Sequence, residues 1–116
     1  HLMSTQLFTV NENDMADMAT SIMEWNNIHH VPVLNDNHEL CGLLTWNHMV
    51  EYLKEKSDFT GTKVGQLMVK QVISVTPDTE IETVSHLLEK NRIGCLPVVR
   101  GNNLVGIITA NDMSGI

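Results

Sequence analysis

Apolar residues recur along this chain with two spacings, one typical of strands and one typical of helices. A β-branched run at 72–75 predicts a short strand, and Thr76 and Pro77, which follow it, suit the cap and the first turn of a helix. Two further apolar runs at 96–100 and 104–109 predict strands joined by a tight Gly-Asn-Asn turn. The intervening helix is expected to present one apolar face, made of Ile81, Val84 and Leu88.

The same order of elements is predicted twice, because the sequence repeats itself. Residues 28–34 return 65 positions later as 93–99, and residues 40–49 return 64 positions later as 104–113. The polar stretch 35–39 absorbs the difference of one residue, as a surface loop can. Each copy therefore predicts the order β-α-β-β-α.

The sequence also predicts where the helices end and which of their faces are apolar. Asn26 and Asn91 are suitable C-terminal stops, and Thr45 is expected to cap a helix that runs from Asn47 to about Lys56. The apolar face of the first helix is expected to comprise Met15, Met18 and Ile22. The apolar face of the last helix is expected to comprise Met49, Tyr52 and Leu53.

The repeat divides the chain into copies at 4–56 and 64–116, with a linker at 57–63. We expect residues 1–3 to have been added ahead of an excised fragment, whose native sequence begins at Met3 or the residue after it. A half-sheet of three short strands cannot bury both of its faces, so the two copies should pack on each other with pseudo-two-fold symmetry. The expected fold class is α+β.

Composition and charge narrow the function. The 116 residues include 7 Lys and Arg against 14 Asp and Glu, a formal net charge of -7, and a field of that sign repels the phosphates of long nucleic acids. No apolar window of about 18 residues could span a membrane, and a hydrophobic fraction of 42% argues against disorder. We therefore expect a soluble, cytoplasmic protein without a nucleic-acid partner or direct membrane contact.

Neither catalysis nor metal binding has support in the sequence. Cys41 and Cys95 lie in apolar runs, so we interpret them as reduced core thiols of an intracellular protein. His29 and His30 are adjacent in a predicted strand and point to opposite faces, and the other histidines have no metal-ligand spacing with them. No Ser/His/Asp or Cys/His arrangement comes with a catalytic motif. Both tryptophans are expected at the surface or in an interface.

Three segments of the second copy carry a resemblance. Residues 64–79 read VGQLMVKQVISVTPDT, residues 96–99 read LPVV and residues 105–112 read VGIITAND. Together they resemble the cystathionine-β-synthase (CBS) motif, and the first copy is similar but more diverged. The resemblance covers about residues 4–116, and two such motifs form a Bateman module. It implies a regulatory domain attached to an enzyme, channel or transporter, paired into a dimeric disk, with AMP, ADP, ATP or S-adenosylmethionine in clefts between the repeats.

The resemblance also implies a ligand site in the second copy. The Gly-apolar-apolar-Thr-x-x-Asp signature falls on Gly106, Thr109 and Asp112, where the carboxylate would accept hydrogen bonds from both ribose hydroxyls and the threonine would meet a phosphate. Thr-x-x-Asp at a helix start is also a capping box, and the two roles are compatible. Adenine would lie against the first strand and the start of the second. The expected contacts are Val72, Ile73, Gly94, Cys95, Leu96, Pro97, Thr109, Asn111 and Asp112.

The first copy departs from the signature, because His48 stands at the position that matches Asp112. A neutral imidazole has one free lone pair and cannot accept from two hydroxyls at once, so that site should be weak or empty. The remaining candidates for ligand contact are Thr45, His48, His29, His30, Arg92 and Lys70. The last four read alternatively as solvent-facing surface residues.

These observations predict a non-catalytic ligand-sensing module that binds an adenine nucleotide or adenosyl compound and controls an attached or associated enzyme or transporter domain. AMP is favoured, because the negative net charge favours fewer phosphates. No cofactor is expected to be obligatory, and the module is expected to form homodimers. The alternative is a structural dimerisation module with decayed ligand pockets, and Asp112 is the residue that separates the two hypotheses.

Overall fold

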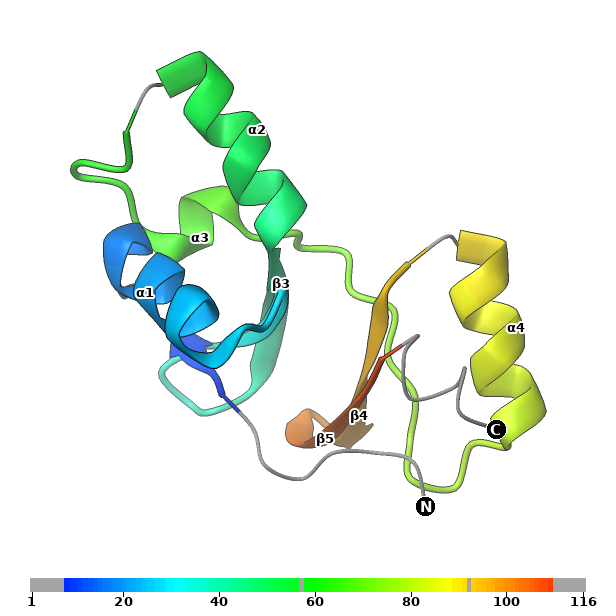
Figure 1. Cartoon of the computed structure of the whole chain (residues 1–116). Coiled ribbons are helices and arrows are strands. Elements are labelled where there is room, and N and C mark those ends of the chain that lie inside the picture. Colours follow the sequence, from blue (N-terminus) through cyan, green and yellow to red (C-terminus); the bar gives the residue numbers. More distant parts are fainter. Residues whose placement is uncertain (1–7, 57, 92, 110–116) are drawn as a thin grey trace. The chain divides into compact units, whose positions relative to one another are not determined.

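The computed structural model describes residues 8–56, 58–91 and 93–109, and it combines helices with short strands (Figure 1). The chain divides into two compact units, and the boundary between them lies after Val72. The first unit comprises residues 8–72, and the second comprises, among the described residues, the chain from Ile73 onward. The first unit contains the predicted order strand-helix-strand-strand, whereas the described part of the second unit contains a helix followed by two strands. This mixed content of helices and strands confirms the α+β class.

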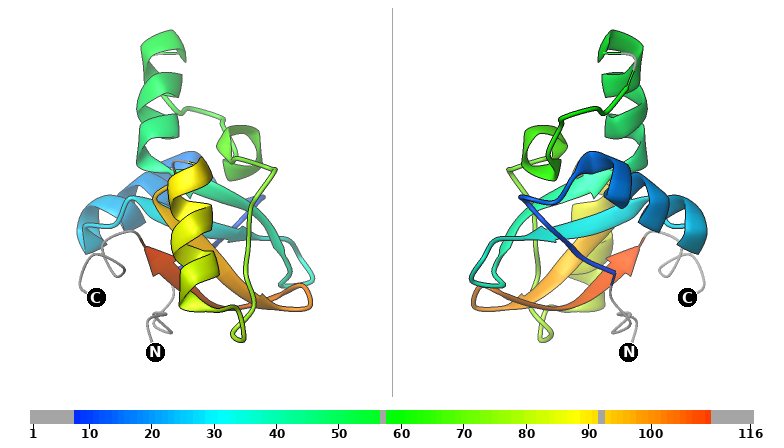
Figure 2. Two further views of the ribbon diagram at one scale, coloured as in Figure 1. Left: turned by 90° about the vertical axis from the view of Figure 1, so that its right-hand side faces the viewer. Right: turned by 90° about the vertical axis from the view of Figure 1, so that its left-hand side faces the viewer.

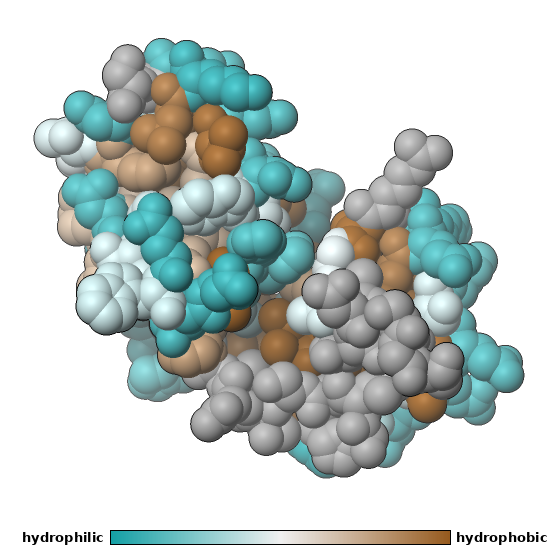
Figure 3. All heavy atoms as spheres, viewed as in Figure 1, coloured by the Kyte–Doolittle hydropathy of each residue, from teal (hydrophilic) through white to brown (hydrophobic). Residues whose placement is uncertain are grey.

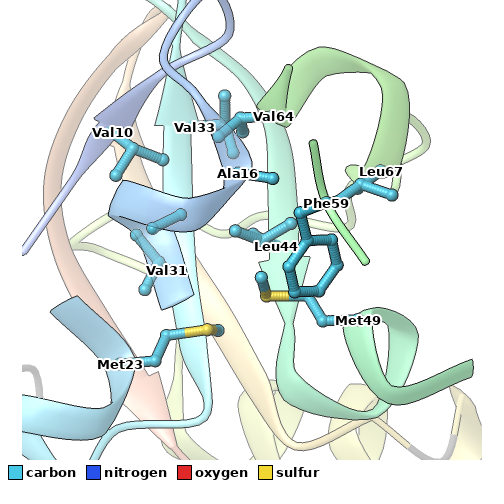
Figure 4. Close-up of a cluster of buried hydrophobic side chains, with 11 residues drawn as sticks. Val10, Ala16, Met23, Val31, Val33, Leu44, Met49, Phe59, Val64 and Leu67 are labelled. Atoms are coloured by element: carbon cyan, nitrogen blue, oxygen red, sulfur yellow. The ribbon is translucent and has the colours of Figure 1, made fainter. Parts of the chain in front are cut away.

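The first unit has a three-stranded sheet in the order β1-β2-β3. Its strands are β1 (Val10–Asn11), β2 (His30–Leu34) and β3 (Leu40–Thr45); β1 runs parallel to β2, and β2 is antiparallel to β3. The helices of this unit are α1 (Ala16–Asn26), α2 (Trp46–Lys56) and the short α3 (Val64–Leu67). Figure 4 shows the side chains of β2 and β3 meeting those of α1 and α2 in the core of this unit.

The second unit, in its described part, contains α4 (Ile81–Asn91) and an antiparallel ribbon of β4 (Cys95–Arg100) and β5 (Asn103–Thr109). Figures 1 and 2 show α4 along one face of this ribbon. Its core consists of Val75, Val84, Leu88, Leu96, Val98 and Ile108. A two-residue turn joins the strands, and Gly101 in it has a φ of 62°, a left-handed conformation that glycine adopts without strain.

The predicted strand at 72–75 is wrong in its length, because only Val75 pairs, in parallel with Val98. Val75 donates to the Pro97 carbonyl at 3.0 Å and accepts from the Val99 N–H at 2.8 Å. The next bond toward the N-terminus would need an N–H on Pro97, and the next bond toward the C-terminus would need an N–H on Pro77. Proline has neither, so one residue pairs and the ladder stops on both sides.

The predicted start of the next helix at Thr76 and Pro77 is also wrong. The Thr79 N–H donates to the Thr76 carbonyl at 3.1 Å, and the Thr76 N–H donates to the Thr79 hydroxyl oxygen at 3.0 Å. These two bonds close a turn with proline at its second position, and α4 begins only at Ile81.

The helix ends follow the sequence. Asn26 and Asn91 are the last residues of α1 and α4, and their side-chain amides donate to the carbonyls of Ile22 and Leu87 at 2.8 and 3.0 Å. Thr45 caps α2, because the His48 N–H donates to its hydroxyl oxygen at 3.2 Å. The predicted ends of α1 and α4 and the predicted cap of α2 are therefore confirmed, and the C-cap of α1 is the next residue, Asn27, which has a left-handed backbone with a φ of 52°.

The predicted apolar faces of α1 and α2 need correction. On α1 the buried residues are Ala16, Ala19 and Met23, whereas Met15 and Met18 are 42% and 45% exposed. Small alanine side chains let the helix approach the sheet closely, and the methionines then face outward. On α2 Met49 is buried, but Leu53 is 38% exposed. Figure 3 shows apolar residues at the surface among hydrophilic ones.

The predicted linker at 57–63, in its described part 58–63, contributes to the core of the first unit. Phe59 and Thr62 are buried, the Thr62 hydroxyl lies 2.9 Å from the Tyr52 hydroxyl, and the Tyr52 and Phe59 rings are stacked. Downstream, Val69 exchanges backbone hydrogen bonds with Leu43 of β3. The chain thus stays with the first unit until residue 72.

Candidate functional site

The strand register of the second unit brings part of the expected site together. Cys95 pairs with Thr109 at one end of the β4–β5 ribbon, and Gly94 immediately precedes Cys95. Leu96 and Pro97 follow along β4. The two segments that the resemblance selected, 94–97 and the threonine of the signature, are therefore neighbours at this end of the ribbon.

The edge of β4 beside this end is incompletely paired. Pro97 has no N–H to donate to the Ile73 carbonyl, and among the described residues neither the N–H nor the C=O of Ile73 has a hydrogen-bond partner. Strand alternation directs the backbone groups of Cys95 to the same edge as those of Pro97. This edge offers a donor and acceptors to a planar ring, which suits the edge of a nucleobase.

The side chains at the start of β4 are not exposed at this edge. Cys95, Leu96 and Pro97 are all buried, and Leu96 belongs to the core of its unit. Ile73 is 36% exposed and Val72 is half-buried, so these two are the apolar side chains that a base could contact. Residues 95–97 can thus contact a ligand at this edge only through their backbone groups.

Several expected contacts have no description in the structure. Arg92, Asn111 and Asp112 lie outside the described residues. Thr109 is described and half-buried, and it already interacts with another group of the chain. Lys70 is exposed and belongs to the first unit.

The corresponding end of the first unit carries histidines. His30 pairs with Thr45, as Cys95 pairs with Thr109. His30 is half-buried, and burial, with a smaller contribution from His29, lowers the pKa of its imidazole, which therefore favours the neutral form. His48 is exposed in the first turn of α2, where Asp112 would stand in the second copy.

One contact at this end was not predicted from the sequence. The rings of His29 and Trp46 are stacked, with centroids 6.3 Å apart and an interplanar angle of 29°. The backbone N–H of Trp46 donates to the His29 carbonyl at 2.9 Å, and the indole ring packs against the core of the first unit. The signal in the sequence is that His29 and Trp46 stand where the other copy has glycine and alanine.

Cys41 and Cys95 are not joined by a disulfide, and Cys95 is buried whereas Cys41 is only half-buried. Burial raises the pKa of the Cys95 thiol to about 12. Burial also raises the pKa of Cys41, with a further contribution from the Glu12 carboxylate, which lies 3.9 Å from its sulfur. Among the described residues, no group of three or more His, Cys, Asp or Glu side chains could hold a metal ion, and no helix is long and apolar enough to cross a membrane.

The buried Cys95 thiol predicts a pH dependence of stability. In the unfolded chain the thiol ionises near its ordinary pKa of 9.0, whereas in the folded chain it stays protonated until about 12. Its contribution is complete below pH 9 and is lost as the pH rises toward 12, at about 1.4 kcal/mol per pH unit. Urea unfolding at pH 8 and pH 10 should show a smaller loss of stability in Cys95→Ala than in the wild type. Equal losses would contradict the burial of an un-ionised thiol.

Comparison with known proteins agrees with the motifs and the fold. The sequence model of the CBS domain matches residues 1–55 and 64–115. The chain belongs to the CBS domain family. It is 31% identical to the CBS domain-containing protein YhcV of Bacillus subtilis, over 97% of this chain and 79% of that protein. It is 32% identical to a homoserine O-acetyltransferase of Methanococcus vannielii, over 98% of this chain but only 23% of the enzyme.

Two solved structures of CBS proteins with bound ligands are similar to this chain. The CBS domain pair of protein MJ0100, in complex with 5′-methylthioadenosine and S-adenosyl-L-methionine, has a TM-score of 0.89 at 25% identity, over 98% of this chain and 90% of that one. CBSX2 in complex with AMP has a TM-score of 0.86 at 26% identity, over the same shares. The chain is thus a CBS domain pair, a regulatory module rather than an enzyme, and it spans about a quarter of the enzyme relative named above.

Proposed function

We propose that this CBS domain pair senses an adenosyl compound, with AMP as the favoured ligand, and binds it at the edge of β4 in the second unit. The observation that carries the proposal is the unpaired backbone of Ile73, beside the end of the ribbon where Cys95 pairs with Thr109. The bound adenosyl ligands of two similar CBS structures support it. AMP is preferred over ATP because the net charge of -7 disfavours additional phosphates.

In this proposal each group has a stated task. The backbone of Ile73 and Cys95 reads the edge of the base, and the exposed part of the Ile73 side chain covers one face of the ring. The Asp112 carboxylate accepts from the ribose hydroxyls, and Thr109 meets the phosphate, with Asn111, Arg92 and Lys70 as further polar contacts. The ligand then regulates an attached or associated protein, by no more than its difference in affinity for the two states of that protein.

Isothermal titration calorimetry tests the binding step. The purified chain is titrated with AMP, ADP, ATP and S-adenosylmethionine, with GMP as a control for the base. Saturable binding of about one adenosyl ligand per chain, tightest for AMP, is the expected result. Flat titrations with all four ligands would reject the sensor.

The structural dimerisation module is the second candidate, and exposed apolar side chains on α1 favour it. Met15 and Met18 are 42% and 45% exposed, Trp25 is 87% exposed, and together with Ile22 they recur at the spacing of one helix face. Dimerisation is compatible with sensing, so we include a homodimer in the proposal. In the absence of ligand binding, the dimer alone would define the function.

The proposed dimer makes a direct prediction about Met18. Met18→Lys places a charge in the apolar face and should raise the dissociation constant of the dimer at least about tenfold. The control is Asp17→Lys, because Asp17 is exposed on the same helix but points about 100° away from Met18. Sedimentation equilibrium measures both. Equal effects of the two substitutions would exclude this face of α1 from the interface.

A further inference from the structure

The two units differ most in side-chain size at equivalent positions near the candidate site. His29 stands where the second copy has Gly94, and Trp46 stands where it has Ala110. Glycine and alanine carry at most one methyl group there, whereas the first copy carries an imidazole and an indole. Both substitutions go from small to aromatic, and both flank residues that correspond to expected ligand contacts.

The two large side chains of the first unit are joined to each other. Their rings are stacked, with a centroid distance of 6.3 Å, within the range of aromatic pairs, and a tilt of 29° between the ring planes. The backbone N–H of Trp46 donates to the His29 carbonyl at 2.9 Å, and the partly buried indole ring packs on the core of the unit. A backbone hydrogen bond and the packing of the indole on the core therefore hold the two stacked rings in place.

The position of the stack is that of the candidate site in the other copy. In the second unit the site lies where Cys95 pairs with Thr109, and in the first unit the equivalent pair is His30 and Thr45. His29 directly precedes β2, and Trp46, the first residue of α2, directly follows β3. The stacked rings therefore lie at the end of the β2–β3 pair that corresponds to the candidate site of the second unit.

We propose that the His29–Trp46 stack closes the first unit's counterpart of the ligand site, so that the chain binds one adenosyl ligand instead of two. The inference rests on the proposed function of the second unit and deepens it, because it sets the stoichiometry. The alternative explanation is that the first site is weak only because His48 replaces the carboxylate. In that case, restoring a carboxylate at position 48 would by itself restore binding.

The test restores the carboxylate with and without the stack. Equilibrium dialysis with labelled AMP counts ligands per chain in the wild type, in His48→Asp, and in the triple variant His29→Gly, Trp46→Ala, His48→Asp. We expect about one ligand in the wild type and in His48→Asp, and about two in the triple variant. Two ligands in the wild type or in His48→Asp would overturn the inference, as would no additional ligand in a folded triple variant.

Removal of Trp46 also removes core contacts, so a second variant keeps the test decisive. His29→Gly with His48→Asp breaks the stack but leaves the indole packed on the core, and circular dichroism checks its fold. It should also gain a second, weaker site, and its failure to do so while folded would overturn the inference. If the wild type binds no AMP, the proposed function of the second unit fails. The stack is then judged by whether the variants that lack it gain an AMP site that His48→Asp lacks.

Discussion

Asp112→Ala is expected to weaken AMP binding by about 100-fold. The substitution removes an acceptor of two charge-assisted hydrogen bonds from the ribose, and their loss together corresponds to about 3 kcal/mol. Calorimetry under the conditions used for the wild type measures the change. The matched control is Asp78→Ala, because Asp78 is an exposed carboxylate of the same unit and its removal changes the net charge equally.

The result also separates the two roles of the Thr-x-x-Asp signature. If Asp112 serves only as a helix cap, its loss should cost about 1 kcal/mol of stability and leave AMP affinity unchanged. An unchanged affinity in a folded Asp112→Ala variant would therefore remove the ribose contact from the account. A loss of affinity as large in Asp78→Ala would point to net charge instead.

Leu44→Ala is expected to destabilise the first unit by about 3 kcal/mol. Leu44 lies on β3 with no exposed surface, in the cluster that also contains Met49 and Phe59 (Figure 4). Truncation of a buried leucine removes transfer free energy and leaves a cavity. Leu53→Ala provides the comparison, because Leu53 is 38% exposed and its truncation should cost less than about 1 kcal/mol.

Urea unfolding followed by circular dichroism measures both leucine variants. A lower midpoint with an unchanged slope is expected for Leu44→Ala. If both variants lost the same stability, the assignment of Leu44 to the core and of Leu53 to the surface would be wrong.

The repeat made most of the fold predictable. Equivalent positions adopt equivalent structures: Val10 pairs with Val33 as Val75 pairs with Val98, and Asn26 ends its helix as Asn91 does. Such features depend on local signals, namely β-branched runs, turn residues and caps, and these are visible in one dimension.

The errors arose where tertiary contacts choose between local alternatives. Met15 and Met18 form an apolar face as regular as that of Ala16 and Ala19, and only packing against the sheet decides which one is buried. The length of the strand around Val75 depends on Pro77, which follows it, and on Pro97 of the neighbouring β4, because neither proline can donate the next hydrogen bond of the ladder.

The site was partly predictable for the same reason. The motif located the segments, and the register then brought Cys95 beside Thr109. The stack of His29 on Trp46 was missed, because the two residues are 17 positions apart and only the β2–β3 pairing brings them together. Its signal becomes visible when the two copies are compared for side-chain size.

Backbone amide NMR of the ¹⁵N-labelled chain during titration with AMP tests the central claim most directly, since it locates the ligand residue by residue. We predict saturable shifts of the amides of Ile73, Gly94 and Cys95. The equivalent amides in the first unit, those of Phe8, His29 and His30, should not move. Shifts confined to the amides of the first unit, or no shifts in either unit at saturating AMP, would contradict the account.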